Sequence, residues 1–63
     1  MVKEVKLGRD YFNRLIKLKE TDNRVKIYID NENGEINGIE FTFEQLTNFA
    51  LNLTLYILGK KEK

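Results

Sequence analysis

Hydrophobic and polar residues alternate along residues 24–29, with Val25, Ile27 and Ile29 on one side of the chain. A period of two residues predicts a β-strand with one buried face. Alternation resumes at residues 39–43, after a polar segment rich in Asn and Gly. Two alternating stretches separated by such a segment predict an antiparallel β-hairpin.

The register of this hairpin depends on which side chains must share a face. A two-residue loop at the first Asn-Gly pair would set Ile27 opposite Glu40, which mixes the apolar and polar faces. A three-residue loop at residues 32–34 instead pairs Ile27 with Ile39 and puts a glycine at the left-handed position of the turn. We expect that loop, with a five-residue loop as the alternative. The second Asn-Gly pair, residues 37–38, then lies in or at the start of the strand, where we expect a β-bulge.

The N-terminal third of the chain allows two interpretations. Residues 1–7 alternate weakly and predict a short strand. Over residues 10–19 the apolar side chains gather on one side of a helix, and Asp10 suits its N-cap. Adjacent apolar pairs in this segment cannot share one face of a strand, so we expect a helix there. A strand over residues 15–19 is the alternative, because that segment also alternates.

The longest stretch with little charge, residues 42–59, predicts a C-terminal helix. Thr42 and Gln45 match a capping box, in which each side chain bonds to the backbone N–H of the other residue. Gly59 is suited to end the helix, and the basic tail, residues 60–63, complements the negative end of the helix dipole. The helix itself spans about 24 Å.

Together these elements predict one small α+β domain over residues 1–63. We expect the order βαββα, with an antiparallel hairpin and the long C-terminal helix packed on the sheet. A β-meander followed by one C-terminal helix is the alternative. In either arrangement the expected core consists of apolar residues from the hairpin and the last helix: Val25, Ile27, Ile29, Ile39, Phe41, Leu46, Ala50, Leu53 and Ile57.

The C-terminal helix carries two separate apolar surfaces. The inner stripe occupies an arc of about 140° and is the ordinary core-facing surface of an amphipathic helix; it consists of Phe43, Leu46, Phe49, Ala50, Leu53, Tyr56 and Ile57. The outer strip, Leu51, Leu55 and Leu58, is centred about 150° away. One sheet face cannot cover both surfaces. The outer strip is therefore expected to pack against the first helix or against another chain.

The composition favours another chain. A domain of 63 residues gains marginal stability from its own core, and small domains often depend on disulfides, metals or subunit association. The sequence contains no Cys and no His, which excludes disulfides and leaves only carboxylate-type metal sites. We expect no metal and no cofactor, and we expect a homodimer. The predicted partner-binding residues are Phe49, Leu51, Leu55, Tyr56 and Leu58.

The distribution of charge supports an alternative partner. The formal net charge is only +1, but residues 1–29 carry eight basic and four acidic residues, whereas residues 30–59 carry five acidic and no basic ones. A basic N-terminal half could contact nucleic acid or an acidic partner; the candidate contacts are Arg9, Arg14, Lys17, Arg24 and Lys26. The C-terminal helix has no Lys or Arg before residue 60, which makes it a poor recognition helix.

The available side chains argue against catalysis. The chain has no Ser, Cys or His and no glycine-rich phosphate loop, so we do not expect an enzyme. We expect a non-enzymatic protein–protein interaction module, a small inhibitor or regulator that binds a larger protein target. The abundance of Asn, Lys and Ile suggests an AT-rich genome, as in a low-GC microbe or a virus. Lys3, Glu4 and Lys6 interrupt any N-terminal apolar run, so we expect no secretory signal, no membrane association and a cytoplasmic location.

Overall fold

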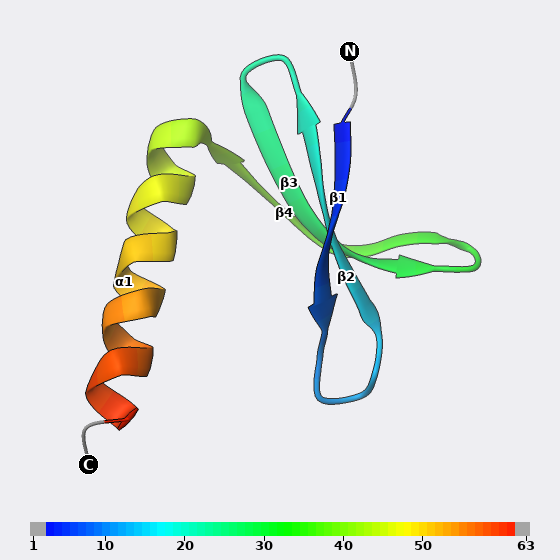
Figure 1. Cartoon of the computed structure of the whole chain (residues 1–63). Helices are drawn as coiled ribbons and strands as arrows, with labels where there is room; N and C mark the ends of the chain where they lie inside the picture. The colour runs from blue at the N-terminus through cyan, green and yellow to red at the C-terminus, as the bar shows by residue number, and fades with distance from the viewer. Residues whose placement is uncertain (1–2, 62–63) are drawn as a thin grey trace.

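The computed structural model, which describes residues 3–61, consists of one four-stranded antiparallel sheet and one C-terminal helix. The elements are β1 (Lys3–Arg9), β2 (Leu15–Thr21), β3 (Arg24–Asn31), β4 (Gly34–Thr42) and α1 (Phe43–Lys61). The strands lie in the order β1-β2-β3-β4, so each pairs with the next along the chain (Figure 1). This confirms an α+β domain with an antiparallel hairpin and a long C-terminal helix. The β-meander, our alternative, replaces the order βαββα.

The helix expected over residues 10–19 is wrong. Residues 10–14 form a loop between β1 and β2. In β2, Ile16 and Leu18 alternate with lysines, and the strand lies between β1 and β3 in the sheet. Strands β1 and β3 both pair with β2, and these ladder hydrogen bonds outweigh the helical spacing of the segment. The Asp10 carboxylate accepts hydrogen bonds from the backbone N–H of Phe12 (3.0 Å) and of Arg14 (2.8 Å). Asp10 thus closes a hairpin loop and does not cap a helix.

The register between β3 and β4 agrees with the prediction beyond the loop. Ile27 pairs with Ile39, as expected from the shared face of the two strands. The three-residue loop is wrong, because Asn31 pairs with Gly34 and leaves only residues 32–33 in the turn. A two-residue loop sets the opposite parity at the tip, so the register must shift by one residue farther along the hairpin.

A β-bulge at Asn37 and Gly38 supplies this shift. The register changes between Ile27 and Ile29 of β3, and Asn37 has a φ of 54°, in the left-handed region. A side chain at Gly38 would collide with the Lys26 side chain, which passes close over the glycine. The expected bulge is therefore confirmed, and it returns the hydrophobic residues of β4 to the apolar face of the sheet.

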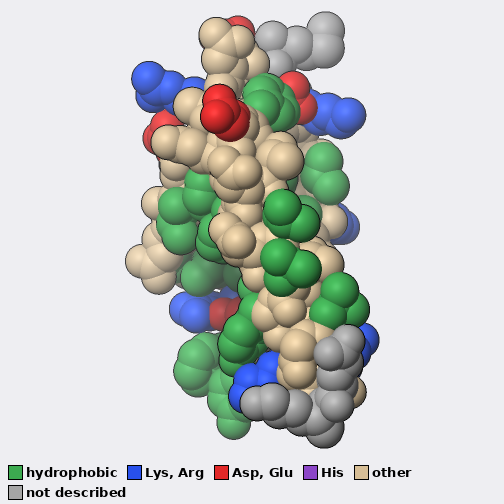
Figure 2. Space-filling view, turned by 90° about the vertical axis from the view of Figure 1, so that its left-hand side faces the viewer, with side chains coloured by type: hydrophobic (Ala, Val, Ile, Leu, Met, Phe, Trp, Pro, Cys, Tyr) green, Lys and Arg blue, Asp and Glu red, His purple; other side chains and the backbone are tan. Residues whose placement is uncertain are grey.

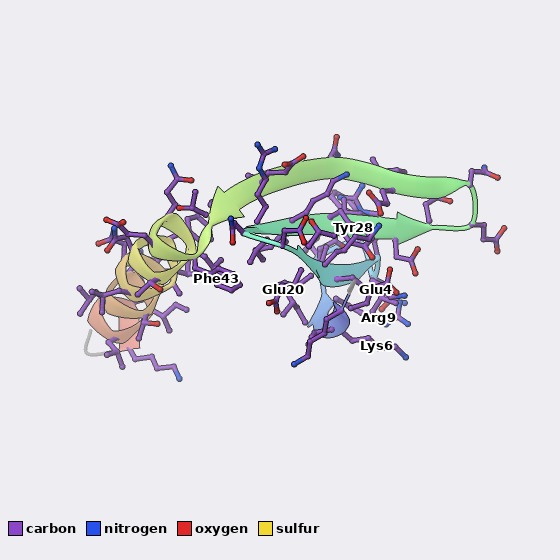
Figure 3. The ribbon with its side chains drawn as sticks, turned by 90° about the horizontal axis from the view of Figure 1, so that it is seen from above. Glu4, Lys6, Arg9, Glu20, Tyr28 and Phe43 are labelled. Atoms are coloured by element: carbon purple, nitrogen blue, oxygen red, sulfur yellow. The ribbon has the colours of Figure 1, made fainter. Side chains whose placement is uncertain are left out.

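The core is small and lies in β3. Val25 (1% exposed), Tyr28 (3%) and Ile29 (9%) are buried. Tyr28 points away from the apolar face, and its hydroxyl lies 3.3 Å from the Glu4 carboxylate, with which it shares a hydrogen bond (Figure 3). The Lys19 ammonium lies 5.4 Å from the centre of the Tyr28 ring. The long side chains of the polar face thus bury an aromatic ring that the predicted core did not include.

Much of the predicted core is exposed, because α1 contacts only β3 and β4 among the described strands. Val25 and Ile29 are buried as expected, whereas the remaining residues fall into two groups. The half-buried group is Ile27, Phe41 and Leu46, and the exposed group is Ile39, Ala50, Leu53 and Ile57. Placing the exposed group in the core of a single chain was wrong.

The C-terminal helix begins where the sequence predicts and ends later. It starts at Phe43 directly after β4, but Gly59 lies inside the helix, which continues to Lys61. Residues 62–63 of the predicted basic tail and residues 1–2 of the predicted first strand lie outside the described residues. The helix stands beside the sheet and is joined to it at its N-terminal end (Figure 1). The Cα radius of gyration, 13.3 Å, exceeds the value of about 11 Å expected for a compact domain of this length.

Candidate protein interaction surface

The junction between β4 and α1 fixes the direction of the helix. Thr42 is the last residue of β4 and the N-cap of α1, so no flexible linker separates the two elements. The Gln45 N–H donates to the Thr42 hydroxyl, and the Thr42 N–H donates to the Gln45 side chain, both at 3.1 Å. The rings of Phe41 and Phe49 lie with centroids 5.2 Å apart. The first two turns of α1 are therefore tied to the sheet, and the rest of the helix follows their direction.

The outer strip is exposed along its whole length. Leu51, Leu55 (57% exposed) and Leu58 all lie on the solvent side of α1, and Figure 2 shows hydrophobic side chains along this helix. The helix expected over residues 10–19, the alternative cover for the strip, is replaced by a loop and β2. Two threonines border the strip, and their hydroxyls turn back to carbonyl oxygens of the preceding helical turn. The border of the strip is thus less polar than its composition suggests.

The inner stripe is exposed as well: Leu46 is half-buried, whereas Phe43 (48% exposed) and Phe49 (47%) are as exposed as the residues that follow them. Leu53 is 48% exposed, Tyr56 64% and Ile57 44%, although their angular positions are those of core residues. At the C-terminal end a shallow hollow of about 270 Å³ is lined by Leu55, Tyr56, Gly59 and Lys60. The hollow joins the inner stripe to the outer strip. All five predicted partner-binding residues therefore lie on α1 and are exposed. Leu53 and Ile57, which we predicted to be core residues, are exposed on the same helix.

The accessible area measures how much surface this arrangement leaves uncovered. The chain exposes 5,499 Å². A compact monomer of 7.5 kDa is expected to expose about 4,250 Å². The difference of about 1,250 Å² is more than the area that one partner contributes to a standard protein–protein interface, about 800 Å².

The predicted basic contacts are engaged within the protein. Arg14 pairs with Asp10 (2.7 Å), Lys17 with Asp30 (2.9 Å), Lys26 with Glu35 (2.6 Å) and Arg24 with Glu40 (3.5 Å). The Arg9 guanidinium donates a hydrogen bond to the Asn13 carbonyl. Because the first helix does not exist, these residues also do not share one helix face. They lie on β1, β2, β3 and the first loop.

Two of these acidic partners, Glu35 and Asp10, have pKa values below their ordinary ones. Hydrogen bonds from Lys19 and then Lys26 hold the pKa of Glu35 below its ordinary value, and the Glu35 hydrogen bond raises the pKa of Lys19. The backbone N–H of Arg14 lowers the pKa of Asp10. These groups keep their charges near neutral pH, as surface ion pairs do, and none is shifted toward acid–base chemistry at that pH. Within residues 3–61 no cluster of three or more carboxylates is placed to hold a metal ion.

The tip of the β1–β2 hairpin carries an exposed aromatic pair, Tyr11 and Phe12, in the segment that we expected to be a helix. Tyr11 is 94% exposed and Phe12 70%, and their rings meet edge to face with centroids 5.2 Å apart. The Arg14 guanidinium lies 5.2 Å from the centre of the Phe12 ring. The sequence signal for this loop is Asp10, whose carboxylate accepts hydrogen bonds from the loop backbone at Phe12 and Arg14.

Comparison with protein-family models, with curated proteins and with solved structures gives no match for this chain. The helix of the described part of the chain is too polar to cross a membrane. The surface of α1 therefore has to be interpreted from its own geometry.

Proposed function

We propose that the protein is a non-enzymatic protein–protein interaction module that works as a homodimer. The single observation that carries the proposal is the exposed apolar surface of α1, on a chain whose accessible area exceeds that of a compact monomer by about 1,250 Å². Large contiguous apolar surfaces on small proteins mark interaction sites. We also propose that the protein acts in the cytoplasm.

A second copy of the same chain is the occupant that fits this area. The excess area of one copy, about 1,250 Å², is larger than the area of about 800 Å² that each partner contributes to a standard interface, so a homodimer interface needs only part of it. Most soluble oligomers are symmetric dimers, in which the same patch meets itself. Between Phe43 and Gly59 the helix carries one charged residue, Glu44, so no repeated like charge opposes the pairing along that length.

Sedimentation equilibrium of the full chain tests the homodimer. We expect the mass of two 7.5 kDa chains at micromolar concentration, and a melting temperature that rises with concentration. A single-chain mass that persists up to millimolar concentration would contradict the proposal. A concentration-independent melting temperature at the same time would show that one chain folds without a partner.

The outer strip is the surface that we propose for a larger protein target, with the dimer acting as its inhibitor or regulator. The strip lies about 150° around the helix from the inner stripe, so a dimer formed by the inner stripe leaves it accessible. Leu55→Glu should therefore leave the dimer mass unchanged and abolish target binding. Dissociation of the Leu55→Glu dimer would assign the strip to the homodimer interface and remove it as the target site.

The five basic residues that were candidates for nucleic-acid contacts have partners within the protein, which disfavours nucleic-acid binding as the alternative function. Four of the five candidate bases form ion pairs with neighbouring carboxylates, and the fifth bonds to a carbonyl. Phosphate contacts would have to replace these pairs, whose loss offsets part of the gain from counterion release. Binding to double-stranded DNA at low salt, with a steep loss at moderate salt, would restore this alternative.

A further inference from the structure

The C-terminal half of the inner stripe lies beyond the turns of α1 that are held against the sheet of its own chain. The capping box and the contact between Phe41 and Phe49 hold the first two turns of α1 in place. A helix is rigid over the remaining turns, so residues 50–61 cannot bend back to the sheet without breaking the cap. Leu53 and Ile57 therefore require a surface from another chain. This step rests on the proposed homodimer.

The spacing of the inner stripe is suited to a helix as that surface. Phe43, Leu46, Ala50, Leu53 and Ile57 follow one another at intervals of three, four, three and four residues. This is the spacing of the seam between two packed helices. Ala50 is the smallest residue of the seam and permits a close approach there. The described residues contain one helix, α1, so in a homodimer the partner helix is the α1 of the second copy.

The charges of α1 favour an antiparallel pair. Glu44 is the charged residue of the first turn, and Lys60 and Lys61 lie in the last. A parallel pair would bring the four lysines of the two copies together at one end, where like charges repel. An antiparallel pair separates them, opposes the two helix dipoles and brings the lysines of each copy toward the Glu44 end of the other.

The placement of the sheets favours the same orientation. Each sheet is attached to the N-terminal end of its helix, where α1 contacts β3 and β4 (Figure 1). In a parallel pair both sheets would crowd around the same end. In an antiparallel pair they lie at opposite ends, and the exposed C-terminal halves of the two helices overlap in the middle.

We infer that the homodimer interface is an antiparallel pair of α1 helices, one from each copy, that meet through the C-terminal half of the inner stripe. Leu53 lies at the two-fold axis and Ile57 one turn beyond it, whereas Leu46 of the two copies lies far apart. The outer strip faces away from the helix pair. The first test is the dimer dissociation constant of variants on the two sides of α1.

Leu53→Glu should raise the dissociation constant about a thousand-fold, because it puts one buried charge on each copy and removes two buried leucines. Leu55→Glu, the matched control on the opposite side, should change it less than about threefold. Both positions are about half exposed, so circular dichroism should show the same helix content at low concentration. A dimer that tolerates Leu53→Glu and dissociates with Leu55→Glu would overturn the inference while leaving the homodimer itself in place.

Single cysteines test the orientation, because the native sequence has none. Two cysteines form a disulfide only when their Cα atoms lie within about 7 Å. Leu53→Cys should cross-link the dimer under mild oxidation, whereas Leu46→Cys should not, since its two copies lie more than about 15 Å apart along an antiparallel pair. Equal cross-linking at both positions would demonstrate a parallel pair and refute the inference. A wild-type chain that sediments as a monomer would instead refute the proposed function.

Discussion

Replacing Thr42 with alanine tests whether the junction between β4 and α1 is stabilised by its capping box. The Thr42 hydroxyl accepts the Gln45 N–H at 3.1 Å, and this N–H is one of the four at the start of a helix that have no partner within it. Alanine cannot accept this bond. We expect the free energy of unfolding to fall by about 1 kcal/mol, within the range of about 0.5–2 kcal/mol measured for such caps.

Two other threonines of the same helix provide matched controls. The hydroxyls of Thr47 and Thr54 donate to the carbonyl oxygens of Phe43 (2.9 Å) and Ala50 (2.8 Å), which already belong to the helix. These bonds add little, and alanine has the higher helix propensity. Thr47→Ala and Thr54→Ala should therefore be neutral or stabilise the protein by a few tenths of a kcal/mol, up to about 0.5.

Thermal unfolding followed by circular dichroism at 222 nm measures the difference. For a domain of this length, about 1 kcal/mol corresponds to about 4–8 °C in the melting temperature. All variants must be compared at one protein concentration, because the proposed homodimer would melt at a higher temperature at a higher concentration. If Thr42→Ala melts no lower than Thr47→Ala, the capping box does not stabilise the junction and does not hold α1 away from the sheet.

Three further predictions concern the sheet and its first loop. Val25→Ala should lower the free energy of unfolding, measured in urea, by about 2–3 kcal/mol, because it leaves a cavity at the most buried position. Ile39→Val, at an exposed side chain, should lower it by about 0.5 kcal/mol or less. Equal losses for the two variants would mean that the core lies elsewhere. The lowered pKa of Glu35 means that its stabilising effect is present above its ordinary pKa of 4.5 and is lost as pH falls below it. The melting temperature of Glu35→Gln should therefore fall less between about pH 5 and pH 3 than that of the wild type. The same fall in both proteins would contradict this prediction. Asp10→Ala should speed amide hydrogen exchange at Phe12 and Arg14, which donate to its carboxylate, while exchange in β3 stays the same; unchanged exchange at both amides would show that the loop does not depend on Asp10.

The features that the sequence predicted correctly are those decided over short distances along the chain. The start of α1 is specified by two residues three positions apart, Thr42 and Gln45. The pairing of Ile27 with Ile39 follows from parity within one hairpin. The loop length was wrong because a two-residue turn followed by a bulge gives the same pairing beyond the bulge as a three-residue turn. The alternation of side chains specifies the pairing beyond the bulge, but it does not specify the turn length and the bulge separately.

Residues 10–19 could not be assigned correctly because the deciding interactions are non-local. The apolar spacing of this segment fits one side of a helix, and Asp10 has the same local chemistry at a helix N-cap and in a hairpin loop. The decision lies with β1 and β3, which pair with β2 along nearly its whole length. The second apolar surface of α1 was visible in the sequence, but the exposure of the first was not. Angular spacing identifies which residues of a helix are apolar, whereas the direction of the helix relative to the sheet depends on the junction.

In the proposed homodimer, the junction makes stability and assembly two aspects of one equilibrium. A helix free to lie across the sheet would use its inner stripe to complete the core of a single chain. The cap directs α1 away from the sheet instead, so the area that would stabilise a monomer stays available for a second copy. A variant that loosens the junction, such as Thr42→Ala, should then weaken both properties, by two different routes. It weakens the capped helix, but it also allows α1 to approach its own sheet, which competes with dimerisation. We therefore expect the dimer of Thr42→Ala to dissociate at a higher concentration than the wild type, even at temperatures where both are fully folded.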